Sequence, residues 1–366
     1  MSLLERFMRT LFRRRGADAG GLAPDQHDAK LVLQQADAAF RGGRLNDALR
    51  IYHDCIARDP RLLDAHLGAA AVLVDLWDLD GAVDAYARAH EIAPALAAVM
   101  SAWLFHRHYD ASLDAPALAA AHRRYGQLFS RSGETANQSA RDPERRLRIG
   151  YVSPNLSRHS VGYFAEPVIR CHDRGQFEVF CYYNHELADD ATERMRKLAD
   201  GWREIAGKDD ATVARMIVDD RIDILVDLAG HSKGNRLAVF ARKPAPVQMT
   251  WLGYPDTTGL AAIDWRLTDA MTDPAPAAEL RHSEKLARID GCFLCYEPPA
   301  DAPAVRLRES GAPIVFGSFN HLAKINRTTL ALWSRVLDAV PEIGRAPSEL
   351  QSRLHLVCRL LPEKKN

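Results

Sequence analysis

The sequence has little of what marks several large classes of protein. Its 366 residues include six cysteines, 8% aromatic residues and no net charge, since 48 basic side chains balance 48 acidic ones. Six scattered cysteines do not form a disulfide framework, so we expect a reducing, cytoplasmic location. A neutral chain has no overall field to attract a phosphate polymer, which argues against nucleic-acid binding. No stretch approaches the ~20 apolar residues of a membrane span.

Apolar residues make up 47% of the chain, enough to build the cores of two or three domains. Residues 1–29 contribute little to this material. A short arginine-rich amphipathic stretch there passes into a linker of Gly, Ala, Asp and Pro without an apolar period. We therefore expect residues 1–29 to form a disordered leader.

An internal repeat follows this leader. Five positions recur 34 residues later, which is the tetratricopeptide period. The two sets are Ala36, Leu45, Ala48, Tyr52 and Pro60, and then Ala70, Leu79, Ala82, Tyr86 and Pro94. The repeat predicts pairs of antiparallel helices, in which small alanines allow close approach and proline ends the second helix. Because two repeats are fewer than an independent stack needs, we expect residues 96–129 to cap them, giving a helical arm over 30–130.

After Arg146 short apolar runs alternate with amphipathic segments. Strands are predicted at 147–152, 177–183, 222–228 and 247–252, and helices at 163–171, 191–199, 211–219 and 235–241. Near-continuous apolar strands separated by helices indicate a parallel sheet covered on both faces. We expect this lobe to span residues 146–300. Ligands of such sheets bind beyond the carboxyl ends of the strands, which points to the loops after Val152, Leu228 and Trp251.

Two of these loops carry histidine. His159 lies just before a predicted helix, where an imidazole can face a cleft and exchange a proton near neutral pH; the alternative is a surface hydrogen-bonding residue. Asp227 and His231 lie in a loop bracketed by glycines. That loop is either a place where backbone amides approach a ligand or an ordinary turn with local hydrogen bonds. No G-x-G-x-x-G motif follows, so a dinucleotide site is not supported.

Two patterns resemble metal motifs. Asp78 and Asp80 form an Asp-x-Asp pair, but the pair falls in the turn of the second repeat. Cys292 and Cys295 have the spacing of a zinc knuckle, yet no second Cys or His pair lies nearby and the residues between them are apolar. We interpret the cysteines as core packing and expect no metal site.

The last informative segment runs from Ile314 to Asn326. It predicts a strand that ends at Phe319, then a polar loop with Lys324, then an amphipathic helix; the apolar positions of that helix are Leu330, Trp333, Val336 and Leu337. This order is how a second doubly wound domain begins, and we assign its start to residues 312–341. Lys324 can place a point charge against a phosphate.

Together these segments resemble the catalytic region of the bacterial protein O-linked N-acetylglucosaminyltransferases that carry tetratricopeptide repeats. The likeness rests on residues 148–153 with His159 and 161–164, on 223–231, on 244–248 with 251–255, and on Phe319-Asn320 with 322–325. It extends roughly from Leu31 to Pro341. Several long motifs in the order of the family make it far more specific than any one of them.

The resemblance implies a two-lobed, Rossmann-like glycosyltransferase that moves N-acetylglucosamine from UDP-GlcNAc to Ser or Thr hydroxyls with inversion. It implies that the arm recruits protein or peptide acceptors, and that neither a metal nor another cofactor is needed. A cationic side chain and helix amides can stabilise the departing diphosphate in place of a divalent ion. The residues that it assigns are His159 as catalytic, Lys324, Asn320 and His321 as donor-binding, and His231 and Tyr254 as cleft-lining. His321 stands where the family usually has an amide.

Residues 342–366 show neither a strand pattern nor a likeness to the family. Our interpretation is an artefactual or frame-shifted tail on a C-terminally truncated chain, whose second lobe is only begun and which has little or no turnover. Two alternatives stay open. One is a non-catalytic tetratricopeptide adaptor whose α/β lobe only binds partners, and the other is a related transferase that uses another sugar or acceptor atom.

Overall fold

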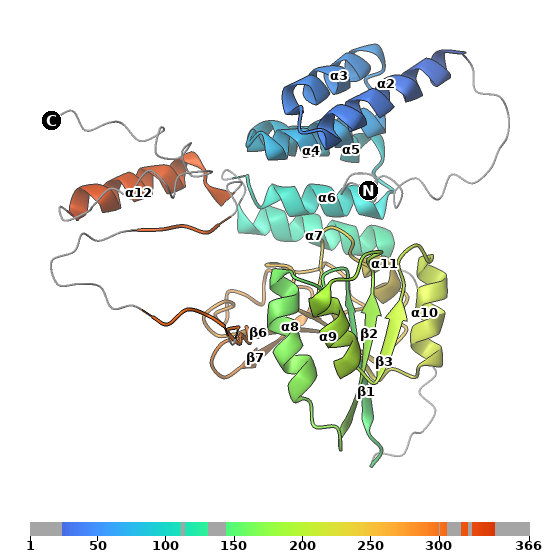
Figure 1. Ribbon diagram of the computed structural model, residues 1–366, viewed down its shortest axis with the longest axis vertical. Helices are drawn as coiled ribbons and strands as arrows, with labels where there is room; N and C mark the ends of the chain where they lie inside the picture. The colour runs from blue at the N-terminus through green and yellow to red at the C-terminus, as the bar shows by residue number, and fades with distance from the viewer. Residues whose placement is uncertain are drawn as a thin grey trace.

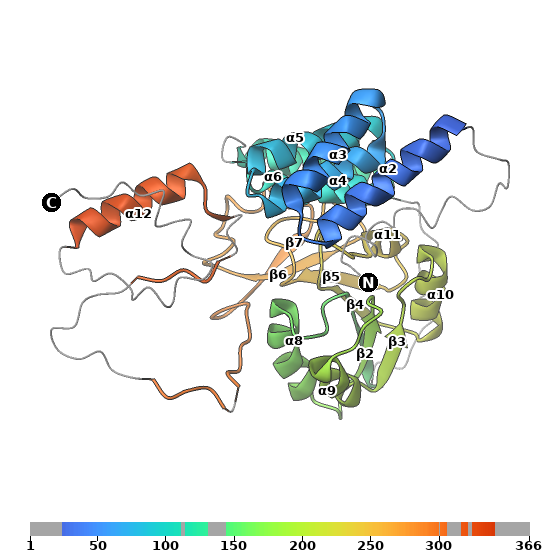
Figure 2. The same ribbon diagram turned by 45° about the horizontal axis from the view of Figure 1, so that its top comes forward.

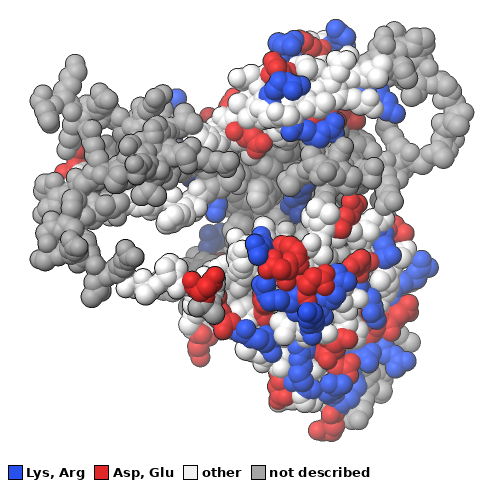
Figure 3. Space-filling model, viewed as in Figure 1, with Lys and Arg blue, Asp and Glu red and all other residues white. Residues whose placement is uncertain are grey.

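The computed structural model has a helical arm followed by an α/β lobe, as the sequence predicts (Figure 1). It describes residues 24–110, 114–130, 144–299, 301–305, 316–320 and 324–340. Within these ranges no helix is both long and apolar enough to cross a membrane. Basic and acidic side chains are interleaved over the face drawn in Figure 3, in keeping with the neutral net charge.

The arm consists of antiparallel helices in the predicted pairs: α2 (Pro24–Arg41), α3 (Leu45–Arg58), α4 (Leu63–Asp75), α5 (Leu79–Ile92), α6 (Ala97–Arg107) and α7 (Ala115–Phe129). Equivalent positions of the repeat are buried in both pairs, including Tyr52 and Tyr86, so the 34-residue repeat is confirmed. One boundary needs correction. α2 begins at Pro24, within the predicted disordered leader, because proline suits the first turn of a helix and the repeat helix propagates back to it. Residues 1–23 lie outside the described ranges.

The lobe is built on a seven-stranded parallel sheet of order β3-β2-β1-β4-β5-β6-β7. Its elements are β1 (Leu147–Ser153), α8 (Ser160–Cys171), β2 (Phe177–Tyr183), α9 (Asp190–Leu198), β3 (Gly201–Glu204), α10 (Asp210–Asp219), β4 (Ile224–Asp227), α11 (Leu237–Phe240), β5 (Val247–Trp251), β6 (Trp265–Asp269) and β7 (Lys285–Ile289). All four predicted strands are present. β3, β6 and β7 were missed because each has four or five residues, charged ones among them, and no long apolar run.

The strand order sets the place of a ligand site. The chain builds β2 and β3 on one side of β1, then crosses to β4 and continues to β7 on the other side. At such a switch in strand order the loops that leave β1 and β4 diverge, and the place between them at the carboxyl edge, called the crevice below, is where α/β sheets bind ligands. This is the edge to which the sequence pointed.

The last two helices of the arm lie across the carboxyl edge of the sheet (Figures 1 and 2). Val99 of α6 packs in the cluster that includes Tyr86 of the second repeat. On the other side, Met100, Leu104 and Tyr125 belong to the same buried cluster as Phe240 of the lobe. α6 and α7 therefore contribute to the core of both regions, so that the arm and the lobe are packed as one body at this point.

The segment predicted to open a second lobe is only partly as expected. Residues 316–320 form no strand, and Phe319 is fully exposed, so the predicted strand end is wrong in this described part. No neighbouring strand lies beside it to accept its backbone hydrogen bonds among the described residues. The predicted amphipathic helix is present as α12 (Arg327–Ala339), but it buries none of its side chains. Residues 341–366 lie outside the described ranges.

Candidate functional site

Three loops converge at the carboxyl edge of the sheet. Asn184, after β2, donates a hydrogen bond from Nδ2 to the carbonyl oxygen of Gly234, after β4, at 2.8 Å. Gly234 has a φ of +76° and lies so close to Pro154, after β1, that a Cβ there would be 3.0 Å from the proline ring. The glycine predicted to allow close backbone approach is therefore used to pack the loops around the crevice.

His159 stands at the N-terminus of α8, next to this crevice. Its Nδ1 accepts a hydrogen bond from the backbone N–H of Val161 at 3.1 Å, so the imidazole caps the helix. An Nδ1 that accepts leaves the ring proton of neutral histidine on Nε2. Partial desolvation lowers the pKa of His159 below its ordinary value, so this neutral form prevails at pH 7. In this tautomer Nε2 is a hydrogen-bond donor rather than a base.

Asp227, at the end of β4, shapes the second loop. Its carboxylate accepts hydrogen bonds from the backbone N–H groups of Ala229 (3.1 Å) and Gly230 (2.8 Å) and from the Thr250 hydroxyl (2.8 Å). Of the two interpretations that the sequence left open, the locally bonded turn describes Asp227. Its buried position raises the pKa of the carboxyl to about 6, although these three donors favour the ionised form.

The Asp227 carboxyl should make the protein more stable in mild acid than at neutral pH. A raised pKa means that the folded state holds the proton more tightly than the unfolded state, so the contribution is complete below the unfolded pKa and is lost as the pH rises through about 6. Its size is about 1.4 kcal/mol for each unit by which the pKa is raised. Urea unfolding between pH 4 and 7, compared for the native chain and Asp227→Asn, measures it. A variant with the same pH slope as the native chain contradicts the assignment.

His231 and Tyr254 do not line an open cleft, and this prediction is corrected. They are 1% and 2% exposed. Nε2 of His231 donates to the carbonyl oxygen of Thr258 at 2.9 Å, and Nδ1 accepts from the Ser101 hydroxyl of α6 at 2.9 Å. Burial lowers the pKa of His231 well below its ordinary value, so it stays neutral. Both residues are buried because α6 and α7 cover the loops that carry them.

A polar cluster that the sequence did not reveal lies at this junction. The Tyr254 hydroxyl is 2.8 Å from Nε2 of His122 in α7 and 2.9 Å from Nε2 of His108 at the end of α6. The carboxylate of Asp256 is 4.0 Å from the same nitrogen of His108. No local signal could have found this set, because Tyr254 lies 132 residues after His122 in the chain.

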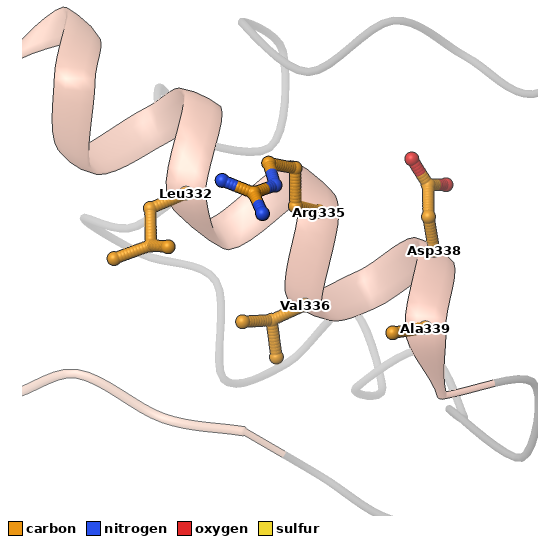
Figure 4. Close-up of a pocket in the computed structure, with 5 residues that line it drawn as sticks. All are labelled: Leu332, Arg335, Val336, Asp338 and Ala339. Atoms are coloured by element: carbon orange, nitrogen blue, oxygen red, sulfur yellow. The ribbon is translucent and has the colours of Figure 1, made fainter.

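Two of the predicted donor residues, Lys324 and Asn320, lie in the segments before α12 and not in the loops around the crevice. Lys324 and Asn320 are exposed, and the hydrogen bonds of Asn320 are local, to Ser318. His321 lies outside the described residues. A shallow hollow on α12 has a lining drawn from that helix alone, namely Leu332, Arg335, Val336, Asp338 and Ala339, with Leu332 and Val336 on one side (Figure 4). A hollow with one wall offers no convergent groups for a ligand.

The structure also places the aspartate pair and the cysteine pair that resemble metal motifs in the sequence. Asp78 caps α5 by accepting a hydrogen bond from the N–H of Gly81 at 3.0 Å, which accounts for its place in the turn. Cys292 and Cys295 carry free thiols and are exposed, so the prediction of core packing is wrong. They follow β7, the edge strand of the sheet, where no further described strand covers them.

Most of the lobe matches a known protein family. The family model for glycosyl transferase family 41 matches residues 127–297. A solved structure of a mutant O-GlcNAc transferase from Thermobaculum terrenum has 32% sequence identity, covers 88% of this chain and is itself covered to 68%, with a TM-score of 0.66. The chain belongs to glycosyl transferase family 41. The match to the family model begins at the end of α7 and ends shortly after β7, so it includes the lobe with its crevice but not α6 or most of α7.

Two curated proteins from eukaryotes are also similar to this chain. A Petunia hybrida protein named probable UDP-N-acetylglucosamine–peptide N-acetylglucosaminyltransferase SPINDLY is 45% identical over 233 residues, 60% of this chain and 24% of that protein. The UDP-N-acetylglucosamine–peptide N-acetylglucosaminyltransferase of Caenorhabditis elegans is 37% identical over 153 residues, 41% of this chain and 13% of that protein. The chain therefore spans about a quarter or less of the length of these curated relatives.

Proposed function

We propose that the protein transfers N-acetylglucosamine from UDP-GlcNAc to Ser or Thr hydroxyls of proteins. The observation that carries this proposal is the switch in strand order between β1 and β4, within the part that matches family 41. His159 caps α8 there, and the backbone N–H groups at the start of α8 lie at the edge where α/β sheets bind phosphorylated ligands. The names of the relatives supply the sugar, the donor and the protein acceptor.

Each part of the chain has a role in this proposal. Residues 30–130 recruit protein acceptors, residues 146–300 form the first catalytic lobe, and residues 312–341 open the donor-binding lobe. His159 donates a hydrogen bond from Nε2 to the acceptor or the sugar, which positions the reacting groups without removing a proton. Lys324, with Asn320 and His321, contacts the donor diphosphate. The reaction needs no metal or other cofactor. The protein works in the cytoplasm.

A transfer assay tests the function. The chain, and a version extended by a complete second lobe, are incubated with host proteins and, in parallel, with labelled UDP-GlcNAc or labelled UDP-glucose, and mass spectrometry identifies the sugar and the modified atom. Labelled Ser or Thr residues with the extended protein support the proposal. Another sugar or an asparagine amide assigns a related transferase. An extended protein that neither transfers sugar nor gains thermal stability with UDP is a binding adaptor, since a ligand of the folded state must stabilise it.

Replacement of His159 should separate its two roles. In the extended protein, His159→Ala and His159→Asn each remove the Nε2 donor, and we expect each to lower the rate at least about tenfold. Only alanine removes the helix cap, at a cost of about 1 kcal/mol in the free energy of unfolding, because asparagine is a good N-cap residue. Transfer rates and urea unfolding of both variants provide the measurement. Native turnover in both variants would exclude His159 from the site.

A further inference from the structure

The junction between arm and lobe gathers three metal-ligand side chains. The ligand atoms of His108, His122 and Asp256 all lie within 4.8 Å of one another. His108 is the C-cap of α6, His122 lies in α7, and Asp256 follows β5, so the ligands come from both the arm and the lobe. Two imidazoles and one carboxylate suit zinc and neighbouring divalent transition ions, whereas Ca²⁺ and Mg²⁺ prefer shells made of oxygen.

His122 is already oriented as a metal ligand. Its Nδ1–H donates a hydrogen bond to the carbonyl oxygen of Leu118 at 2.8 Å, which keeps the proton on Nδ1 and leaves a lone pair on Nε2. Metal-bound histidines are typically held in this way through the second nitrogen.

The spacing of the cluster is close to that of a metal shell. Ligands around a tetrahedral zinc ion, with bonds of about 2.0–2.1 Å, are about 3.3 Å apart. Nε2 of His108 is 4.0 Å from the nearer oxygen of Asp256. The side chains of His108 and Asp256 are 24% and 19% exposed, and they lie at a helix end and in a loop. Small side-chain rotations at these two residues can close the remaining gap.

We propose that His108, His122 and Asp256 bind one zinc ion that fastens the helical arm to the α/β lobe. The Tyr254 hydroxyl lies beside the cluster, because it already contacts both imidazoles. Binding requires the proton of His108 to move to Nδ1, so that Nε2 turns from donor to ligand. Because the ligands come from α6, α7 and the loop after β5, an ion held by all three fixes the orientation of the arm over the crevice. This inference does not depend on the identity of the sugar or the acceptor.

Cobalt provides a spectroscopic test. Cys292 and Cys295 are exposed thiols with two residues between them and bind such ions themselves, so both are replaced with serine. This protein is treated with a chelator and titrated with Co²⁺, whose visible absorption reports four-coordinate binding. We expect one equivalent to bind, Zn²⁺ to displace it, Mg²⁺ to leave it in place, and Zn²⁺ to raise the melting temperature.

Substitutions decide whether the cluster is the site. His108→Asn and Asp256→Asn change partly exposed side chains, and we expect each to weaken Co²⁺ binding at least about tenfold. Circular dichroism without metal confirms that each variant is folded. His53→Ala, on the exposed face of α3, removes a histidine elsewhere and should bind like its parent. Undiminished binding in both cluster variants, or no visible band with excess Co²⁺, overturns the proposal.

Discussion

Replacement of Gly126 with alanine should lower the free energy of unfolding by about 3 kcal/mol or more. Gly126 lies in α7 against the lobe, and a Cβ there would be 1.8 Å from the carbonyl oxygen of Gly259. That oxygen belongs to a backbone that is itself tightly placed, because Gly259 has a φ of +76° and a Cβ on it would be 1.9 Å from the carbonyl oxygen of His122. The backbone segments that carry Gly126 and Gly259 therefore cannot move apart without opening the shared core.

The sign of the change in the free energy of unfolding tells whether the backbone contact or helix propensity dominates at Gly126. Helix propensity alone predicts that alanine stabilises a helical glycine position by about 1 kcal/mol. Urea unfolding of Gly126→Ala measures which effect dominates, and limited proteolysis shows whether the arm separates from the lobe. Gly317→Ala is the control, since a Cβ there meets no atom within 4 Å, and its stability should change by less than about 0.5 kcal/mol. A Gly126→Ala protein as stable as the native chain would refute the backbone contact.

Replacement of Arg266 with methionine should cost about 3–5 kcal/mol of stability. The guanidinium is buried and is paired with buried Asp273, with Nε 3.2 Å from its carboxylate. It also donates to the carbonyl oxygens of Tyr254 (3.1 Å) and Asp256 (3.0 Å), and so holds the loop after β5. Methionine has a similar volume but leaves a buried carboxylate and two carbonyl groups without this donor.

The matched control is Arg44→Met. Arg44 pairs with Asp47 at 3.6 Å, but both side chains are more than half exposed, and such a surface pair is worth about 0–1 kcal/mol. Chemical unfolding of both variants gives the two free energies. Hydrogen exchange of the Arg266→Met protein should show lost protection in the loop that carries Tyr254 and Asp256. Equal small losses in the two variants would show that the buried pair is not a determinant of stability.

The sequence by itself determined the two-region architecture and the edge of the sheet at which the candidate site is placed. The repeat is visible in the sequence because equivalent positions, such as Tyr52 and Tyr86, are buried in the same kind of helix contact in each pair. β1, β2, β4 and β5 were predictable because a strand covered on both faces reads as an apolar run. The shorter strands, β3, β6 and β7, carry charged residues and gave no such run.

Only the tertiary structure decided how the arm meets the lobe and what the loop residues do. His231 and Tyr254 looked like cleft residues in the sequence, and they became buried because α6 and α7 cover them. The tautomer of His159 depends on one backbone N–H, that of Val161, and the cluster of His108, His122 and Asp256 depends on three elements that meet at the junction. Local patterns record which face of an element is buried, but not what covers it. That is set by contacts between segments far apart in the chain.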